Sequence, residues 1–331
     1  MTDDRTLSTM THDMATHDMA TQGTMALGTM YFGTRVEDTA AFAILDRFVE
    51  LGGQWLDTSD NYSFWTSDTG FGGQSEAVLG RWLRSNPGAP VRLSTKVGAQ
   101  PTRVGGFPDH LEGLGRDTVR AALDGSLRRL GRDKVDLYWA HVEDPSVPTE
   151  ELVGTFSGLV SSGLIDRYGV SNHPSWLVER IRGAAERAGH VQPTAYQQHY
   201  SYYQPLPGVP VEGQPLPLGM LSDDGRDFLR RNPTVAGWVY TATLLGSYDR
   251  DDRPLSAEYR HPGNDRRRSA LAAVAEARGL RRGQVVLAWL TGSRPSLTPI
   301  VGVSTVEQVD QAWTGVTTPL TEQEMAVLNA A

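Results

Sequence analysis

The sequence predicts an α/β protein built as one closed (β/α)8 barrel, and three observations support this fold class. From about residue 26 onward, short β-branched or aromatic runs alternate with amphipathic stretches, which gives eight strand candidates with helices between them. No Gly-x-Gly-x-x-Gly stands at a strand-to-helix turn, which disfavours an open doubly wound sheet. Long Gly/Pro-rich segments follow four strands, on the C-terminal face where a TIM barrel carries its functional loops: 63–74, 99–115, 203–219 and 246–265.

The strands are predicted from β-branched and aromatic runs. In chain order they lie at 26–32, 54–57, 91–97, 135–141, 168–171, 194–198, 235–240 and 299–303. The helices are predicted from an apolar stripe, which in the first helix consists of Phe42, Leu45, Phe48 and Val49. They lie at 39–51, 75–83, 116–130, 150–161, 176–188 and 306–313. Because no linker divides this series, we expect a single domain over residues 25–331.

Residues 1–24 differ from the rest of the chain in composition. They contain twice the imperfect repeat Thr-His-Asp-Met-Ala and have neither a helical nor a strand period, so we expect a disordered N-terminal tail. The pairs His12–Asp13 and His17–Asp18 have a spacing that could bind a metal. Because nothing around them would fix a ligand geometry, we expect no metal site.

The composition excludes several classes of function. The 331 residues include no Cys, which rules out disulfides, thiolate metal sites and cysteine nucleophiles. A net charge of −8 without a long basic run argues against a nucleic-acid or membrane-surface protein. No apolar run approaches the roughly 20 residues that cross a bilayer, and no signal-peptide core follows the start. We therefore expect a cytoplasmic protein that is a monomer or a small homo-oligomer.

Lysine is rare in this chain. Of the 31 basic residues only Lys96 and Lys134 are lysines, and a GC-rich coding sequence is the ordinary explanation of such an arginine bias. Where such a chain keeps a lysine, however, the position can require an amine, because an ammonium is a compact charge whose pKa shifts on burial. Lys96 ends a predicted strand, which makes it the candidate functional lysine.

Four polar residues, Asp57, Tyr62, Lys96 and His141, follow or end three consecutive predicted strands, so the barrel would bring them to one rim. Any one alone would be explained by hydrogen bonding at a strand end, but four at corresponding ends indicate a site. A tyrosine has an ordinary pKa of about 10; an adjacent ammonium lowers it, and a carboxylate keeps the ammonium charged. A neutral histidine can orient a carbonyl oxygen or relay a proton. Such an array protonates a carbonyl but supplies no hydride, so a bound cofactor must act as reductant.

A series of short stretches occurs in order over residues 26–328. They are Leu27-Gly28-Thr29-Met30, Leu56-Asp57-Thr58 with Tyr62, Ser75-Glu76 with Leu79-Gly80, Ser94-Thr95-Lys96, Asp136-Leu137-Tyr138 with His141, Gly169-Val170-Ser171-Asn172, Gln197, Leu287-Ala288-Trp289-Leu290 and Pro299-Ile300-Val301-Gly302-Val303-Ser304. Each stretch is weak by itself, but together they resemble the aldo-keto reductases. The resemblance implies an eight-stranded barrel that binds NADP(H) in an extended form across the rim and reduces a small carbonyl substrate.

The resemblance also implies a role for each matched residue. Tyr62 would be the general acid, with Lys96 and Asp57 as its tuning pair and His141 as the carbonyl-orienting partner. For Tyr240, the alternative to stacking on the nicotinamide is a packed barrel tyrosine with a bonded hydroxyl. The implied cofactor contacts are Gly28, Thr29, Met30 and Asp57 on the first strands, Ser171, Asn172 and Gln197 at the carboxamide, Tyr240 on the nicotinamide ring, Gly246, Ser247 and Arg250 at the pyrophosphate, and Gly302, Ser304 and Gln308 at the adenosine phosphate.

Three features depart from the family pattern. The tail is too polar to supply the hairpin that usually closes the barrel floor, and Thr241-Ala242-Thr243 replaces the usual Ser-Pro-Leu. No Lys or Arg stands close after Gly302, where a basic side chain on the 2′-phosphate would favour NADPH. NAD(H) is therefore not excluded, although the arginines at 266–268 could compensate if they are not solvated surface.

The substrate side is expected to be an apolar, aromatic pocket, with core packing as the alternative for Phe32. Its candidate residues are Tyr31, Phe32, Phe64, Trp65 and Tyr202. The resulting interpretation is a reductase of an aldehyde, a ketone or a related group of a small organic, specialised-metabolite-like substrate. Two alternatives stay open: a cofactor-binding regulatory or sensor subunit without catalysis, and a reductase acting on an imine or a conjugated alkene.

Overall fold

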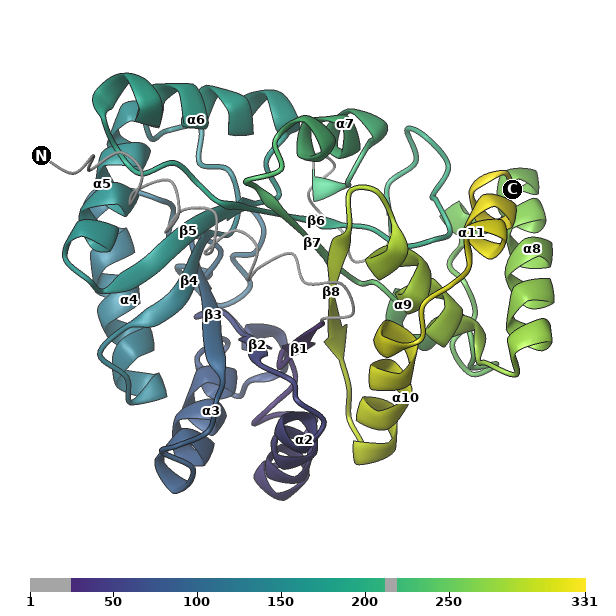
Figure 1. Ribbon diagram of the computed structural model, residues 1–331. Coiled ribbons are helices and arrows are strands. Elements are labelled where there is room, and N and C mark those ends of the chain that lie inside the picture. Colours follow the sequence, from purple (N-terminus) through teal and green to yellow (C-terminus); the bar gives the residue numbers. More distant parts are fainter. Residues whose placement is uncertain (1–24, 212–218) are drawn as a thin grey trace, which may run out of the picture.

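A closed parallel barrel forms the centre of the molecule (Figure 1). The computed structural model describes residues 25–211 and 219–331, so the predicted tail with its histidine–aspartate pairs lies outside the described residues. Each strand pairs in parallel with the next, and β1 pairs with β8 to close the sheet. The predicted (β/α)8 class is confirmed. The strands are β1 (Ala26–Gly28), β2 (Trp55–Asp57), β3 (Arg92–Val97), β4 (Val135–Ala140), β5 (Ile165–Ser171), β6 (Ala195–His199), β7 (Ala236–Tyr240) and β8 (Leu297–Gly302).

Helices surround the barrel and cover the outer face of its strands (Figure 1). Their apolar stripes pack on the sheet; in the first of them Ile44, Leu45 and Phe48 are fully buried. In the part of the chain that the structure describes, the helices are α2 (Asp38–Glu50), α3 (Gln74–Ser85), α4 (Arg116–Leu130), α5 (Thr149–Ser161), α6 (Ser175–Ala188), α7 (Asp223–Arg231), α8 (Pro262–Arg278), α9 (Arg282–Gly292), α10 (Val306–Thr317) and α11 (Glu322–Asn329).

The structure corrects several predicted boundaries. The first strand was expected to reach residue 32 but ends at Gly28, because the Phe32 amide turns back to the Thr29 carbonyl at 2.9 Å. Segment 246–265 was expected to be a loop, yet α8 begins inside it at Pro262, whose fixed φ suits the first turn of a helix. The arginines at 266–268 therefore belong to a helix rather than to a loop. Helices α7, α9 and α11 were not among the ranges expected from the sequence.

Three tryptophans fill the interior of the barrel. Trp55, Trp139 and Trp238 belong to one buried apolar cluster, and the Trp238 ring centroid lies 5.2 Å from that of Trp55 and 5.6 Å from that of Trp139. The guanidinium groups of Arg92 and Arg167 lie over the Trp55 ring at 5.7 and 5.9 Å. Trp55 is the first residue of β2, whereas Trp238 is central in β7 and Trp139 is the last residue but one of β4, so the stack fills the barrel beneath its carboxyl-terminal rim.

Strand alternation places the polar residues above the tryptophans. Side chains two residues apart on a strand point to the same face, so the residue two positions after an interior tryptophan also points inward, one layer closer to the carboxyl ends. Asp57 follows Trp55 in this way, His141 follows Trp139, and Tyr240 follows Trp238. The polar layer thus lies next to the tryptophan cluster, on its side toward the carboxyl ends of the strands.

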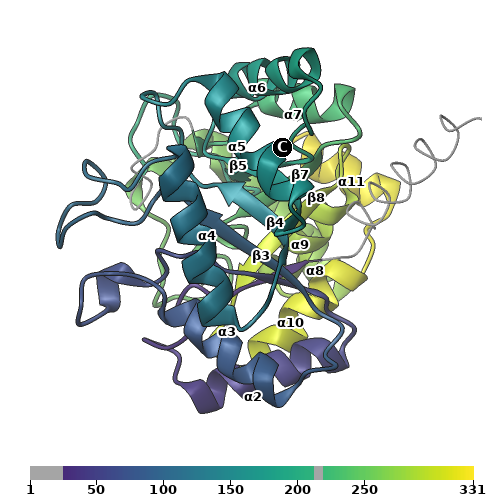
Figure 2. The same ribbon diagram turned by 90° about the vertical axis from the view of Figure 1, so that its left-hand side faces the viewer.

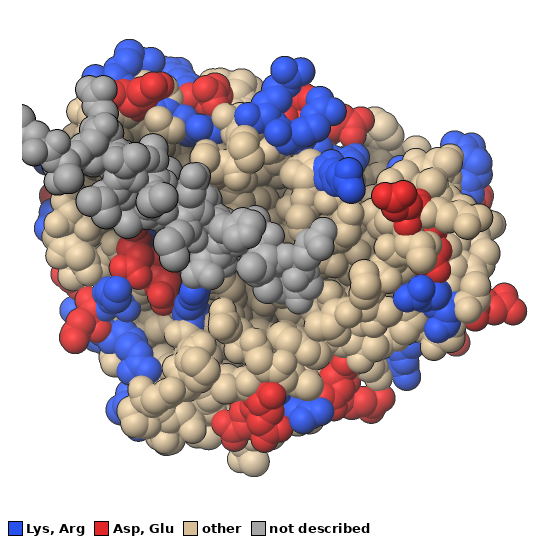
Figure 3. Space-filling model, in the orientation of Figure 1, with Lys and Arg blue, Asp and Glu red and all other residues tan. Residues whose placement is uncertain are grey.

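The loops that follow β2 and β3 project from the same end of the barrel, at the left of Figure 2. Acidic and basic side chains are intermixed around the periphery of the face shown in Figure 3, with uncharged residues between them. Among the described helices, none combines the length and the apolar character needed to span a membrane.

Candidate active site

The four residues expected at the rim come together in the structure. Asp57 is the last residue of β2, Lys96 lies one residue before the end of β3, and His141 follows β4 directly. Tyr62 lies on the loop after β2, whose turn is held by hydrogen bonds from the Tyr62 amide to Ser59 at 3.2 Å and from the Gly73 amide to the Tyr62 carbonyl at 2.8 Å. These two bonds bring the phenol back over the barrel.

Lys96 is the centre of this group. Its side chain is 0% exposed, and its ammonium uses all three protons. Nζ donates to Asp57 Oδ2 at 2.6 Å, to the Thr58 carbonyl at 2.7 Å and to the Tyr62 hydroxyl at 3.1 Å. The ammonium also lies 4.7 Å from the centre of the Tyr62 ring. The geometry therefore fixes the distance between the phenol and its neighbouring charge.

Asp57 is held by a chain of hydrogen bonds that begins in the barrel interior. Trp139 Nε1 donates to Ser94 Oγ at 2.6 Å, and Ser94 Oγ donates to Asp57 Oδ1 at 2.8 Å. Each carboxylate oxygen thus has a fixed donor, since Lys96 occupies the other one. This chain orients the carboxylate and, through it, the ammonium.

Burial dominates the electrostatics of the group. It raises the pKa of Asp57 despite the opposing Lys96 charge. It acts to lower the pKa of Lys96, but Asp57 and Tyr62 outweigh it, so this pKa is raised and the ammonium stays protonated. The pKa of Tyr62 is also raised, because burial outweighs the neighbouring ammonium. The expectation that Lys96 would bring the Tyr62 pKa below its ordinary value is therefore corrected for this structure: the phenol retains its proton at neutral pH.

His141 faces Tyr62 across the rim, with 6.2 Å between ring centroids. Burial, together with the Lys96 charge, holds the pKa of the His141 imidazole well below its usual range, so the ring is neutral. Its Nδ1 lies 3.2 Å from Ser59 Oγ, while no described residue forms a hydrogen bond with Nε2. The ring therefore presents Nε2 as its available nitrogen.

The residues expected at a nicotinamide lie at adjacent strand ends. Asn172, with φ of 59°, donates to the His141 carbonyl at 2.9 Å and accepts from the Tyr240 hydroxyl at 2.6 Å, so it ties His141 to Tyr240. Ser171 is buried beside it. Gln197 Nε2 is buried close enough to Asp57 to oppose in part the rise in the pKa of that carboxyl, yet it has no hydrogen-bond partner of good geometry among the described residues.

The residues expected at the phosphates lie after β7 and at or after the end of β8. Arg250 forms an exposed ion pair with Asp252 at 2.6 Å. Gln308 Oε1 accepts from the Ser304 amide at 2.7 Å, so these two residues already bind each other at the start of α10. The other residues expected to contact the cofactor lie at strand ends or in the segments that follow them: Gly28, Thr29, Met30, Gly246, Ser247 and Gly302. No bound group tests these assignments, and they stay predictions.

Aromatic side chains gather beside Tyr62. Trp65 is 41% exposed, and its ring lies edge-on to Tyr31 at 6.3 Å and to Tyr62 at 6.4 Å. Phe64 contacts Trp65 at 4.9 Å and, on its other side, Phe107 of the next loop at 5.1 Å. Phe107 was not expected from the sequence, because only the folded loop brings it here.

Two residues expected in this pocket lie elsewhere. Phe32 is 1% exposed and packs in the main core, as the alternative interpretation had it. Tyr202 is 0% exposed; its hydroxyl donates to the Leu328 carbonyl at 3.0 Å and its ring packs against Trp289 of α9. Both side chains are enclosed by the protein, which argues against contact with a substrate.

A sequence model of the Aldo/keto reductase family matches residues 23–331. The chain belongs to the aldo/keto reductase family. Norsolorinic acid reductase B of Aspergillus parasiticus is 29% identical over 307 residues, which cover 88% of this chain and 74% of the relative. The uncharacterized oxidoreductase YrpG of Bacillus subtilis is 27% identical over 298 residues, covering 88% and 87%. An aldo/keto reductase of Klebsiella pneumoniae, solved with NADP and acetate, has the same fold at 22% identity and a TM-score of 0.67, covering 92% of this chain and 90% of that one.

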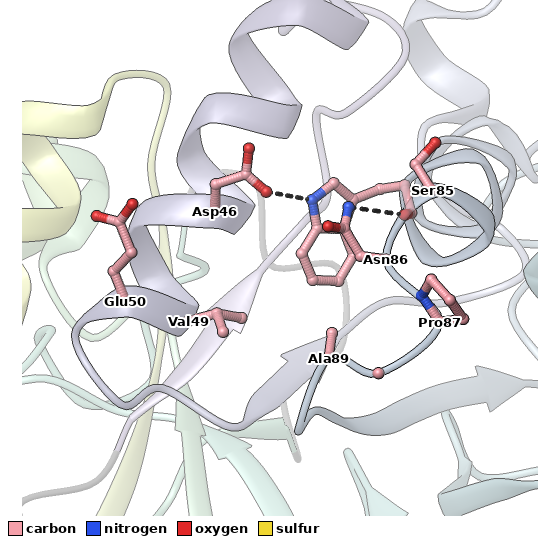
Figure 4. Close-up of a pocket in the computed structure, with 9 residues that line it drawn as sticks. Asp46, Val49, Glu50, Ser85, Asn86, Pro87 and Ala89 are labelled. Atoms are coloured by element: carbon pink, nitrogen blue, oxygen red, sulfur yellow. Dashed lines mark hydrogen bonds between the residues drawn. The ribbon is translucent and has the colours of Figure 1, made fainter.

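This aldo/keto reductase chain also has a depression of about 490 Å³ between α2 and α3 (Figure 4). Asp46 accepts a hydrogen bond from Trp82 Nε1 across it, and Asn86 donates to the Trp82 carbonyl. Residues 86–89 of its lining precede β3, so the depression lies at the opposite end of the strands from Lys96 and is not part of the site.

Proposed function

We propose that the protein reduces the carbonyl group of a small organic substrate, with NADP(H) as hydride donor and Tyr62 as general acid. Family membership makes the chain an oxidoreductase of the aldo/keto class. The observation that carries the finer proposal is the fully buried Lys96 ammonium held between Asp57 Oδ2 at 2.6 Å and the Tyr62 hydroxyl at 3.1 Å. Within a buried site, this arrangement keeps the Lys96 ammonium next to the Tyr62 hydroxyl, whose proton is donated in the proposed reaction.

Residues of the chain hold and donate the proton that the carbonyl oxygen receives. Tyr62 holds it at neutral pH because burial raises the pKa of the phenol. Once the proton passes to the carbonyl oxygen, the phenolate that remains is stabilised by the adjacent Lys96 ammonium. Asp57 keeps that ammonium in place. A bound reduced nicotinamide would supply the hydride to the carbonyl carbon, so that C=O becomes CH–OH.

The residues at the strand ends fit a nicotinamide. A carboxamide offers both a donor and an acceptor, and Gln197 Nε2 is a buried donor without a well-placed partner among the described residues. Tyr240 is only partly buried at the end of β7, with its ring oriented by the hydrogen bond to Asn172 and by an edge-on contact with His199 at 5.5 Å. We assign Gln197 and Ser171 to the carboxamide and the Tyr240 ring to the nicotinamide face.

We expect NADPH and NADH to bind with dissociation constants within about tenfold of each other, which corresponds to ~1.4 kcal/mol. A cation paired with the 2′-phosphate would favour NADPH by more than this. However, no Lys or Arg follows Gly302 in this sequence. Titration calorimetry with both cofactors measures this ratio. Replacing Gln308 by Arg is expected to tighten NADPH alone.

Two results would count against this cofactor proposal. A preference for NADPH above a hundredfold in the unmodified protein would show that a basic group from another segment, such as 266–268, meets the phosphate. Absence of binding for either cofactor would remove the basis of the proposed reduction.

On the substrate side, the exposed aromatic group around Trp65 supports an apolar aromatic carbonyl compound. The name of the Aspergillus relative, a norsolorinic acid reductase, is consistent with this class. Replacing Trp65 by Ala is expected to raise the KM for an aromatic aldehyde several-fold while kcat and the KM for propanal change little, because the ring adds contact area rather than a reacting group.

Steady-state kinetics with 4-nitrobenzaldehyde and propanal measure this split. Trp176 is a matched control, because it is a 60%-exposed tryptophan on α6 and its replacement by Ala should change neither constant. Equal effects of Trp65→Ala on both aldehydes would refute the aromatic assignment.

A further inference from the structure

We infer that Ser59 sets the tautomer of His141, keeping the imidazole proton on Nε2, where it can be donated to the substrate oxygen. The role of that oxygen rests on the proposed reduction, but the tautomer itself does not. Ser59 matches no part assigned by the family resemblance and was not among the expected site residues. Its hydroxyl is fully buried, so solvent offers it no other partner.

The Ser59 hydroxyl has one proton and two acceptors within reach. Oγ lies 3.2 Å from His141 Nδ1 and 3.4 Å from Asp60 Oδ1. If Ser59 donates to His141, Nδ1 is the bare nitrogen and the proton is on Nε2. If Ser59 donates to Asp60, Nδ1 must carry the proton to face Ser59 Oγ, and Nε2 presents a lone pair that repels a carbonyl oxygen.

The state of Asp60 decides between these two arrangements. Its side chain is buried, and burial together with the neighbouring Glu112 and Glu76 raises the pKa of the Asp60 carboxyl well above its usual range. Glu112 Oε1 accepts backbone N–H groups from Gly98 at 2.8 Å and Gln100 at 3.3 Å, whereas no described backbone amide donates to the Asp60 carboxyl. The Asp60 carboxyl is therefore protonated at neutral pH.

A protonated carboxyl is a weaker acceptor than a neutral imidazole nitrogen, because it is far less basic. The shorter of the two contacts is also the one to His141. Both facts direct the Ser59 proton to Nδ1. Since the ring is neutral, its own proton is then on Nε2, the ring nitrogen that no described residue hydrogen-bonds.

The consequence is a pair of donors aimed at one oxygen. The centroids of the Tyr62 and His141 rings are 6.2 Å apart. One carbonyl oxygen placed between these rings can accept from both the Tyr62 hydroxyl and His141 Nε2–H. Ser59 is thus a positioning residue: it touches neither substrate nor cofactor, and it acts through the tautomer of His141.

The tautomer can be read directly by ¹⁵N NMR of the full-length protein labelled at histidine, because the two ring nitrogens shift apart according to which carries the proton. His141 is assigned by difference with His141→Gln. We expect the Nε2–H form in the unmodified protein and a mixture of both forms in Ser59→Ala. We also expect Ser59→Ala to lower kcat by up to ~10²-fold, the lower end of the ~10²–10⁴-fold contribution of a positioned proton donor. The cofactor dissociation constant should not change.

Two variants separate this effect from a general loss of structure. Ser59→Thr keeps the hydroxyl and should retain the Nε2–H form and most of kcat. Ser293→Ala removes a buried hydroxyl at the end of α9 that donates to the Trp289 carbonyl at 2.7 Å, and it should leave activity unchanged.

An Nδ1–H tautomer in the unmodified protein overturns the inference, and so does a Ser59→Ala protein with an unchanged tautomer and full kcat. If Ser59→Ala does not fold, the spectrum of the unmodified protein still decides. An Nε2–H spectrum in a protein that reduces no carbonyl would leave the tautomer assignment standing while the proposed function fails.

Discussion

Replacing Tyr62 by Phe is expected to lower kcat for carbonyl reduction by about 10³-fold or more, within the ~10²–10⁴-fold range of general acid catalysis. The substitution removes only the hydroxyl that lies 3.1 Å from Lys96 Nζ. The ring itself keeps its position over the ammonium and against Trp65, at 4.7 and 6.4 Å, so packing changes little. The loss should therefore appear in kcat and not in cofactor affinity.

The measurement is steady-state oxidation of NADPH with an aldehyde panel, together with calorimetric titration of the cofactor. Unchanged turnover in Tyr62→Phe would exclude Tyr62 as the acid. A protein that binds the cofactor but turns over none of the panel, even with Tyr62 present, would instead favour the non-catalytic regulatory subunit over the enzyme.

Replacing Lys96 by Arg is expected to abolish most activity, by at least ~10²-fold, and to lower the melting temperature. The ammonium makes three hydrogen bonds inside a fully buried site, and a planar guanidinium has neither the size nor the donor directions to reproduce them. Displacing it also leaves the buried Asp57 without its counter-charge, a change that typically costs ~3–5 kcal/mol of folding free energy.

The other lysine is a matched control. Lys134 has a side chain that is 56% exposed and pairs with Asp166 at 2.8 Å, an interaction that an arginine can also make. Lys134→Arg should keep both the activity and the melting temperature of the unmodified protein. Full activity in Lys96→Arg would show that the site requires a positive charge and not an amine.

The barrel and the polar rim were predictable because both follow from short-range patterns. Strand and helix periods identify eight units, and Asp57, Lys96 and His141 stand at the ends of three consecutive predicted strands, whose carboxyl ends meet at one rim of a barrel. This argument does not need to know how the loops fold. Tyr62 lies on a loop, so its place in the sequence after the second strand indicated the rim but not how the loop would position its hydroxyl.

What the sequence did not reveal depends on contacts between distant segments. The aromatic residues after Gly28 look like a strand, but Phe32 is buried because a turn folds it into the core. Tyr202 stands near a strand end in sequence, yet α11 covers it. The direction of the Tyr62 pKa depends on how completely the loop buries the phenol, which no local pattern encodes. In the sequence, Ser59 is an ordinary polar turn residue beside Asp60. Its contact with His141 joins two loops that are distant in the sequence, so no local pattern predicts it.

The three tryptophans at the barrel centre also give the protein an optical signature. Trp55, Trp139 and Trp238 have ring planes 65° to 85° apart at 5.2–5.6 Å, a geometry in which their electronic transitions couple and produce near-ultraviolet circular dichroism. Trp139 is joined to Asp57 through Ser94, so its emission comes from directly beneath the rim and overlaps the absorption of a reduced nicotinamide. Closure of the barrel and arrival of the cofactor can thus be followed as two separate signals, in the unmodified chain and in variants of Tyr62 or Lys96.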